Sequence, residues 1–488
     1  MAQGAIAMNP ALLSALRQAL PTEVILLEER DREMRSGDAL SPARAIHVDQ
    51  EAWWQTPEVV VLPTATEQVA AVVKLACQHR TPVVPFGGGT GVMGGAVPPR
   101  EAIVIDLKGM NRVRSISAED RVAWAEAGVI LSDLDAAVQQ HGLMVGHDPW
   151  STPIATVGGA ISTDGVGYRA ARYGSMGDQV VALEVVLPTG EVLRTRAVPK
   201  RASGPSLERL FIGAEGALGI ITAAALRVFR LPEERRFAAF AFPSFEAGFQ
   251  AVSEMFSLGL RPAITDLTEH PDDEGDKVVM VLTYEGYREE VAAQGQRAAT
   301  IALGHGGADL GPAEAEAYWR ERHRPGERFK QEQMPLLPRE RWRGGWPRGG
   351  HGDYLDLALP ASCVLDYRRQ AQAICAEAGV SIHEYALWTA PELYSMIITR
   401  AAVESNPREG GPSGASLKEK DRASFREVSD RLLRLAQDMG GSMEYCHGIG
   451  LRLAHLAERE WGPNLEAVRR IKRALDPYDI MNPGKLGV

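Results

Sequence analysis

A glycine-rich stretch from Pro85 to Ala96 constrains this chain more than any other segment. Glycine can adopt positive φ and lets the backbone approach a ligand closely. Successive N–H groups in such a turn form a concave nest that binds phosphate oxygens. The stretch is not a Walker loop, since no Gly-Lys-Ser/Thr follows, and Pro98-Pro99 rules out the helix that a Gly-x-Gly-x-x-Gly motif opens. The loop alone fits either a phosphate site or an ordinary glycine-rich hairpin.

The segments around this loop predict α/β units. The helix after the first strand carries one apolar stripe, made of Val69, Val72, Val73 and Ala76. We expect a capping box of Thr64 and Glu67 at the start of this helix, and a second helix capped by Ser132 with Asp135. The predicted strands cover residues 59–62, 82–85, 103–107, 122–126, 180–187 and 191–195.

Two more glycine-dense loops follow the first one. They span Gly146 to Gly165, continuing to Gly174, and Gly213 to Thr222. Three such loops separated by α/β elements indicate a long ligand laid across one domain.

Composition excludes several classes of protein. The 488 residues suffice for two or three domains, and a formal net charge of -10 argues against a nucleic-acid binder. The 4 cysteines contain no Cys-x-x-Cys pair, which fits a reducing cytoplasm. No run of ~18 apolar residues predicts a membrane span, and the first residues do not read as a signal peptide. Peripheral membrane contact stays open.

Several motifs together resemble the vanillyl-alcohol oxidase / p-cresol methylhydroxylase family of FAD enzymes. The resemblance covers about residues 55 to 231 and the C-terminal 50, in order and with matching spacing. The motifs are Phe86-Gly-Gly-Gly-Thr-Gly-Val92, Ala155-Thr-Val-Gly-Gly-Ala-Ile-Ser-Thr163, Tyr173-Gly174, Ile212-Gly-Ala-Glu-Gly-Ala-Leu-Gly-Ile-Ile221 and Met481-Asn-Pro-Gly-Lys-Leu486.

The resemblance implies which residues hold FAD. In that family the first loop cradles the pyrophosphate, the second runs beside the ribityl chain and flavin ring, and the third meets the adenosine side. Many relatives attach the flavin to a histidine of the first loop; that position is glycine here, so we expect non-covalent FAD. The implied cofactor residues are Phe86, Gly87, Gly88, Gly89, Thr90, Gly91, Val92, Ser151, Thr156, Gly158, Gly159, Thr163, Gly167, Tyr173, Glu215, Gly219, Ile220, Ile221 and Asn482.

The chain changes character at Leu231-Pro232. Strand and helix patterns from there on repeat a βαββα order twice, which suggests a duplicated, ferredoxin-like cap domain resting on the flavin. We expect a strand at 442–446 and a last helix at about 452–475. The predicted class is α+β: a lead-in (1–54), a two-part FAD-binding domain (55–231), the cap (232–446) and a returning C-terminal segment (447–488).

His447 is the main catalytic candidate. It lies in Cys446-His447-Gly448-Ile449-Gly450, and a histidine titrates near neutral pH, so it can take an alcohol proton as hydride leaves the adjacent carbon. A histidine hydrogen-bonded in a turn is the plain alternative; related flavoproteins, however, place an active-site histidine in such a motif. Tyr445 is a second candidate.

His383 and Arg348 complete the predicted catalytic set. His383 ends a cap strand, so it could face the flavin, and Arg348 either holds a substrate anion or belongs to a structural turn. The D-lactate and glycolate dehydrogenase branch carries metal-binding histidines near His383. Here Glu-Tyr-Ala-Leu-Trp follows His383 and Cys446 replaces a ligand glutamate, so we expect no metal.

Three functions remain open at this point. The first is an FAD-linked dehydrogenase of a 2-hydroxy acid or alcohol, passing electrons to oxygen, a quinone or a redox protein. The second is a redox-neutral transferase, because several stretches resemble the alkyldihydroxyacetonephosphate synthase branch, although its consecutive histidines are reduced to His447. The third is a flavin-binding protein that has lost catalysis. We expect a cytoplasmic homodimer.

Overall fold

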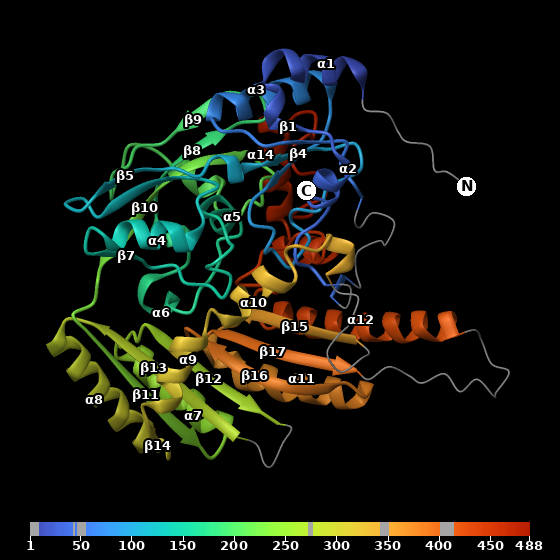
Figure 1. Cartoon of the computed structure of the whole chain (residues 1–488). Coiled ribbons are helices and arrows are strands. Elements are labelled where there is room, and N and C mark those ends of the chain that lie inside the picture. The colour runs from blue at the N-terminus through green and yellow to red at the C-terminus, as the bar shows by residue number, and fades with distance from the viewer. Residues whose placement is uncertain (1–8, 42–43, 46–54, 272–276, 342–350, 401–413) are drawn as a thin grey trace.

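The computed structural model describes residues 9–41, 44–45, 55–271, 277–341, 351–400 and 414–488, with side chains in the last range from 421 onward. Two parts are visible in Figure 1, an upper one from blue to green that also takes the red C-terminal end, and a lower one in yellow and orange. Within the described residues, no helix is long and apolar enough to cross a membrane.

The upper part contains a small sheet that delivers the first glycine loop. Its order is β1-β2-β4-β3, with β2, β4 and β3 parallel. Val69, Val72, Val73 and Ala76 of the covering helix are fully buried, which confirms the predicted stripe. The elements are α1 (Pro10–Ala19), β1 (Ile25–Leu26), α2 (Glu29–Glu33), β2 (Val59–Val61), α3 (Thr66–His79), β3 (Val83–Phe86) and β4 (Ile103–Asp106).

A second sheet in the upper part carries the other two glycine loops. Its order is β5-β6-β10-β8-β9, and β7 also pairs with β10. The elements are β5 (Val113–Ser117), β6 (Val122–Glu126), α4 (Leu131–Gln139), β7 (Leu143–Val145), α5 (Val157–Ser162), α6 (Ala170–Tyr173), β8 (Val180–Val186), β9 (Val192–Arg194) and β10 (Ile220–Arg230).

The lower part is one antiparallel sheet, β14-β11-β13-β12-β16-β17-β15, with helices packed against it (Figure 1). The strands of its first half, β11 to β14, lie in the order β14-β11-β13-β12, which is the order 4-1-3-2 of a ferredoxin-like sheet. The second half repeats three of these four strands as β15, β16 and β17. The predicted duplication is therefore confirmed. The elements are β11 (Glu234–Phe242), α7 (Phe245–Ser257), β12 (Ile264–His270), β13 (Lys277–Gly286), α8 (Arg288–Gly304), β14 (Ala308–Gly311), α9 (Ala313–Glu321), α10 (Arg324–Glu332), β15 (His351–Ala358), α11 (Val364–Ala378), β16 (Ser381–Trp388), β17 (Leu393–Arg400) and α12 (Gly414–Asp438).

The predicted strand at 442–446 is wrong, and the reason bears on the site. Only one bridge forms there, between Ser442 and Ala358, where a fourth strand of the second half would lie. The backbone N–H groups of Cys446 and His447 instead donate to the Glu444 carboxylate, at 2.8 and 2.9 Å. The N–H of Tyr445 still donates to the carbonyl of Asp356 at 3.1 Å, but beyond it the Glu444 side chain takes the donors, so the ladder stops and His447 lies in a loop.

Three further predictions of local structure are also wrong. The last helix is broken at Gly462, which has a φ of +52°, into α13 (Ala457–Trp461) and α14 (Asn464–Leu475). Neither predicted cap forms. The N–H of Thr64 donates to Gln68 Oε1 at 2.8 Å, so Gln68 supplies the acceptor expected of Glu67, and Ser132 lies one residue inside its helix.

The C-terminal segment returns to the small sheet. Met481 bridges Val83 in parallel, and the N–H of Asn482 donates to the carbonyl of Val83 at 2.8 Å. Asn482 lies at a φ of +41° and its side-chain amide donates to the carbonyls of Gly95 and Glu215. The first and third glycine loops are therefore tied together by a residue near the end of the chain.

Candidate functional site

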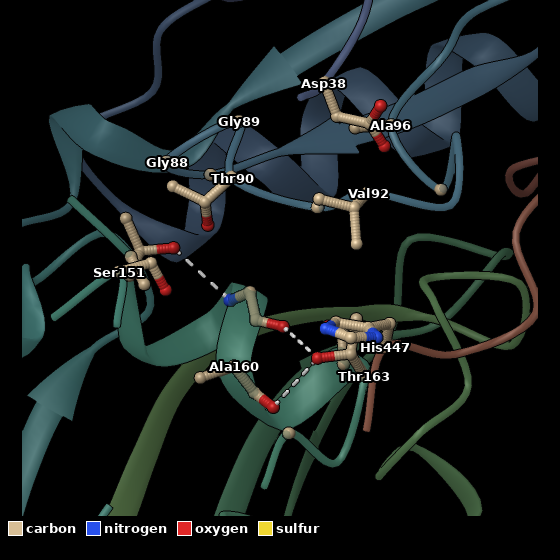
Figure 2. Close-up of a pocket in the computed structure, with 18 of the residues that line it drawn as sticks. Asp38, Gly88, Gly89, Thr90, Val92, Ala96, Ser151, Ala160, Thr163 and His447 are labelled. Carbon is tan, nitrogen blue, oxygen red and sulfur yellow. Dashed lines mark hydrogen bonds between the residues drawn. The ribbon is translucent and has the colours of Figure 1, made fainter. Parts of the chain in front are cut away.

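The three glycine loops meet at one cavity, which also receives His447. Its empty space, with the open mouth included, is about 1150 Å³. Figure 2 shows Asp38 and Val92 along one side and Ala160 and Thr163 along the other. The predicted residues that line it are Phe86, Gly87, Gly88, Gly89, Thr90, Gly91, Val92, Ser151, Thr156, Gly159, Thr163, Glu215 and His447.

The first loop has the form of an anion cradle. Among the described residues, no protein oxygen accepts a hydrogen bond from the N–H groups of Gly88, Gly89 and Thr90. The loop also leaves no room for side chains, since a Cβ on Gly88 would lie 2.4 Å from the carbonyl oxygen of Ile154. Gly89 has a φ of +65°. Free N–H groups on glycine backbone fit a pyrophosphate, so the loop can hold that part of FAD.

The second loop presents a helix end to the same cavity. Thr156 caps α5 by accepting a hydrogen bond from Gly159 N–H at 3.3 Å. Gly158 and Gly167 do not line the cavity. Each allows two segments of backbone to pack closely. A Cβ added to Gly158 would lie 2.7 Å from the Cβ of Ala127, and a Cβ added to Gly167 would lie 2.7 Å from the backbone of Asp148.

Several predicted cofactor residues instead support the loops from behind. Ile220 and Ile221 begin β10 inside the core, and a Cβ on Gly219 would lie 2.8 Å from Val185. The Tyr173 hydroxyl donates to Glu285 Oε1 of the cap at 3.0 Å. None of these four, nor Asn482, is among the described residues that line the cavity.

His447 lies between two carboxylates. Its Nδ1 is 3.2 Å from Asp356 Oδ2 and 3.4 Å from Glu444 Oε1, although neither pair is aligned as a good hydrogen bond. The Ser395 hydroxyl donates to Asp356 Oδ1 at 2.6 Å and lies 3.0 Å from the Tyr445 hydroxyl. The imidazole therefore has a preferred orientation, with Nδ1 toward Asp356 on β15.

The charges around His447 set its protonation. Burial alone would lower the pKa of His447, but Cys446, Glu444 and the nearby Asp356 carboxylate outweigh burial and raise the pKa well above its ordinary value. Burial alone would raise the pKa of Asp356, yet the nearby His447 imidazole leaves it lowered. The proton of the pair therefore lies on the imidazole, and the Asp356 carboxylate is its counter-ion.

The other predicted catalytic residues lie in different places. The Tyr445 hydroxyl belongs to the Ser395 and Asp356 network rather than to the cavity wall. His383 lies on β16, where its Nε2 is 2.5 Å from Thr399 Oγ1, and it does not line the cavity. Arg348 lies outside the described residues.

Sequence reasoning missed several residues of the site. Asp38 reaches the cavity from the segment taken as a lead-in, and no motif marks it. His147 and Trp150 lie in the second glycine-dense loop, whose composition was a usable signal. Cys446 was noted only as a replacement, yet it lines the cavity, where its thiol donates to the carbonyl of Val166 at 3.5 Å.

Comparison with known proteins identifies the family. Residues 57–196 match the FAD binding domain model and residues 231–486 match the FAD linked oxidase C-terminal domain model. The chain is 31% identical to D-lactate dehydrogenase of Archaeoglobus fulgidus, covering 88% of this chain and 91% of that protein. It is 28% identical to alkyldihydroxyacetonephosphate synthase of Trypanosoma brucei brucei, covering 88% and 73%. The solved structure of p-cresol methylhydroxylase with substrate bound superposes with a TM-score of 0.75 at 20% identity, over 98% and 96% of the two chains.

The fold and the glycine-lined cavity define a two-part flavoprotein with a cap. The chain belongs to the family of FAD-linked oxidases and dehydrogenases, and its cofactor is FAD. The predicted resemblance, fold class and cofactor are thus confirmed.

The His447–Asp356 pair yields a test by pH. A base must be deprotonated to act, so the rate of flavin reduction should rise with pH up to the raised pKa of His447. Asp356→Asn removes one cause of that increase, so the rise should move to lower pH, with a maximum ~10-fold lower or more. Anaerobic stopped-flow absorbance across pH measures both. Asp366→Asn, on the exposed side of α11, is the matched control. If the pH profile of Asp356→Asn did not shift, the His447–Asp356 pair would not set the pH dependence of flavin reduction.

Proposed function

We propose that the protein dehydrogenates a hydroxylated small molecule, a 2-hydroxy acid or an alcohol, with His447 as the base. The observation that supports this most is the histidine with a carboxylate behind it, opening onto the cofactor cavity. The similarity to a D-lactate dehydrogenase supports the same reaction class.

The residues of this chain have distinct tasks in that reaction. The nest at Gly88 to Thr90 holds the pyrophosphate, and α5 lies beside the rest of the cofactor. Bound FAD supplies the hydride acceptor. His447 takes the proton of the substrate hydroxyl, and Asp356 orients the imidazole and stabilises the imidazolium that results. We propose that this cluster works without a metal and that FAD is held non-covalently.

A redox-neutral transfer is the second candidate. It is favoured by the similarity to alkyldihydroxyacetonephosphate synthase. Only one of the consecutive histidines expected for that chemistry is present, since Tyr445 and Cys446 precede His447.

An anaerobic titration decides between these functions. We expect the oxidised-flavin absorbance of the purified protein to disappear with at least one compound from a panel of 2-hydroxy acids, aromatic alcohols and aliphatic alcohols. The same rate in the presence of EDTA would support a metal-free site, and FAD released by denaturation would support non-covalent binding. Turnover that leaves the flavin oxidised would favour the transferase, and no response to any compound would contradict the proposal.

A further inference from the structure

We propose that Glu215, which the sequence marked as a cofactor residue, is a positioning residue that holds the loop of His447 in place. The inference rests on the proposed role of His447, but its structural part can be tested separately. Glu215 lies in the third glycine loop, at a φ of +48°, and is 6% exposed. It is more than 200 residues from His447 in sequence, so no local motif connects the two.

The Glu215 carboxylate caps the backbone that follows His447. Its Oε1 accepts a hydrogen bond from Ile449 N–H at 2.6 Å, and its Oε2 accepts one from Gly450 N–H at 2.9 Å. The residue two positions after His447 is therefore fixed to the FAD-binding part of the chain. The two carboxylates beside the imidazole, Asp356 and Glu444, belong to the cap side.

The glycines of the loop allow this close approach. A Cβ on Gly448 would lie 2.5 Å from Glu215 Oε1, and Gly448 has a φ of +82°. On the other side, a Cβ on Gly450 would lie 2.1 Å from the carbonyl oxygen of Met93, which accepts a hydrogen bond from Arg452 N–H. The loop is held between the third glycine loop and the first, so the glycines after His447 serve backbone contacts.

Glu215 also lines the cofactor cavity. The charges of Asp38, which also lines the cavity, and of the buried Lys485 act on Glu215 in opposite directions. Burial, only partly offset by the N–H donors, raises the pKa of Glu215 to about 7. The main chain of Glu215 is fixed as well, since its carbonyl accepts from the Asn482 amide at 2.6 Å. One residue thus contacts the cofactor cavity, the C-terminal segment and the loop of His447.

The test compares three substitutions by a readout that does not need substrate. FAD-saturated protein is treated with diethyl pyrocarbonate, and the labelling rate of each histidine is followed by mass spectrometry. Glu215→Ala frees two N–H groups of the loop, so His447 should be labelled at least about fivefold faster, since the loss of even one hydrogen bond corresponds to about that factor. Glu215→Gln keeps one acceptor oxygen and should restore most of the protection, whereas Glu215→Asp is too short to reach and should not. His305, on the far side of the cap at the end of α8, is the internal reference.

The outcomes separate this inference from the proposed function. Unchanged His447 labelling in Glu215→Ala with weaker FAD binding would make Glu215 a cofactor contact and overturn the inference. If Glu215→Ala does not fold, equal labelling in the Asp and Gln variants would overturn it. Flavin reduction should slow in the same order as labelling rises, Ala and Asp more than Gln. If the labelling of His447 rises in Glu215→Ala but the rate of flavin reduction does not change, Glu215 still positions the loop. The catalytic role proposed for His447 would then be contradicted.

Discussion

Replacing His447 with alanine is expected to slow anaerobic flavin reduction at least ~100-fold while FAD stays bound. The imidazole is the described group that both opens onto the cofactor cavity and is backed by a buried carboxylate, Asp356 at 3.2 Å. Without it no base takes the hydroxyl proton, so the barrier to hydride loss rises. Stopped-flow absorbance after mixing with the best substrate of the panel gives the rate, and the flavin-to-protein absorbance ratio gives the FAD content.

The control for this substitution is His383→Ala. His383 contacts Thr399 on the cap sheet and does not line the cavity, so its removal should leave the rate within a few-fold of the original protein. If His383→Ala slowed flavin reduction and His447→Ala did not, His383 rather than His447 would be the base. Loss of FAD from His447→Ala would show that the histidine binds the cofactor rather than the substrate proton.

The spacing of apolar residues predicted most of the helices and strands, because these elements depend on residues close to one another in the sequence. The stripe at Val69, Val72, Val73 and Ala76 could face only a core, and the repeated βαββα pattern could only form two like halves of one sheet. The errors lie where a nearby side chain takes a backbone N–H group in place of the expected partner. Glu444 takes the N–H groups that a strand at 442–446 needs, and Gln68 takes the role given to Glu67.

Glycines in the motifs correctly predicted the loops that line the cavity. They did not show which glycine faces the cavity and which one only allows two segments of the protein to pack together. Gly88 and Gly158 look alike in the sequence, yet one faces the cavity and the other packs on Ala127. The carboxylates around His447 come from β15 and from the loop itself, and Asp38 comes from the N-terminal segment. Such groupings depend on long-range topology, which a single sequence does not display.

Gly88→Ala is expected to weaken FAD binding about tenfold to hundredfold. Gly88 lines the cavity without a positive φ, so the added methyl group acts by volume alone. Its Cβ would lie 2.4 Å from the carbonyl oxygen of Ile154 and 3.2 Å from the Cα of Ala155, both backbone atoms that cannot rotate away. Overpacking of this kind costs about 1–3 kcal/mol, and each 1.4 kcal/mol is tenfold in a dissociation constant.

The consequence falls on the cofactor because the clash separates the two loops that enclose it. Moving Ile154 outward shifts Thr156, the cap of α5, and opens the nest at Gly88 to Thr90. FAD affinity is measured by fluorescence quenching on titrating FAD into the apoprotein, with thermal unfolding recorded in parallel. Gly304→Ala, at the end of α8, meets no atom within 4 Å and should change neither quantity. Normal FAD affinity in Gly88→Ala would mean that the first loop does not hold the pyrophosphate, whereas lower thermal stability without loss of affinity would assign Gly88 to packing between the loops.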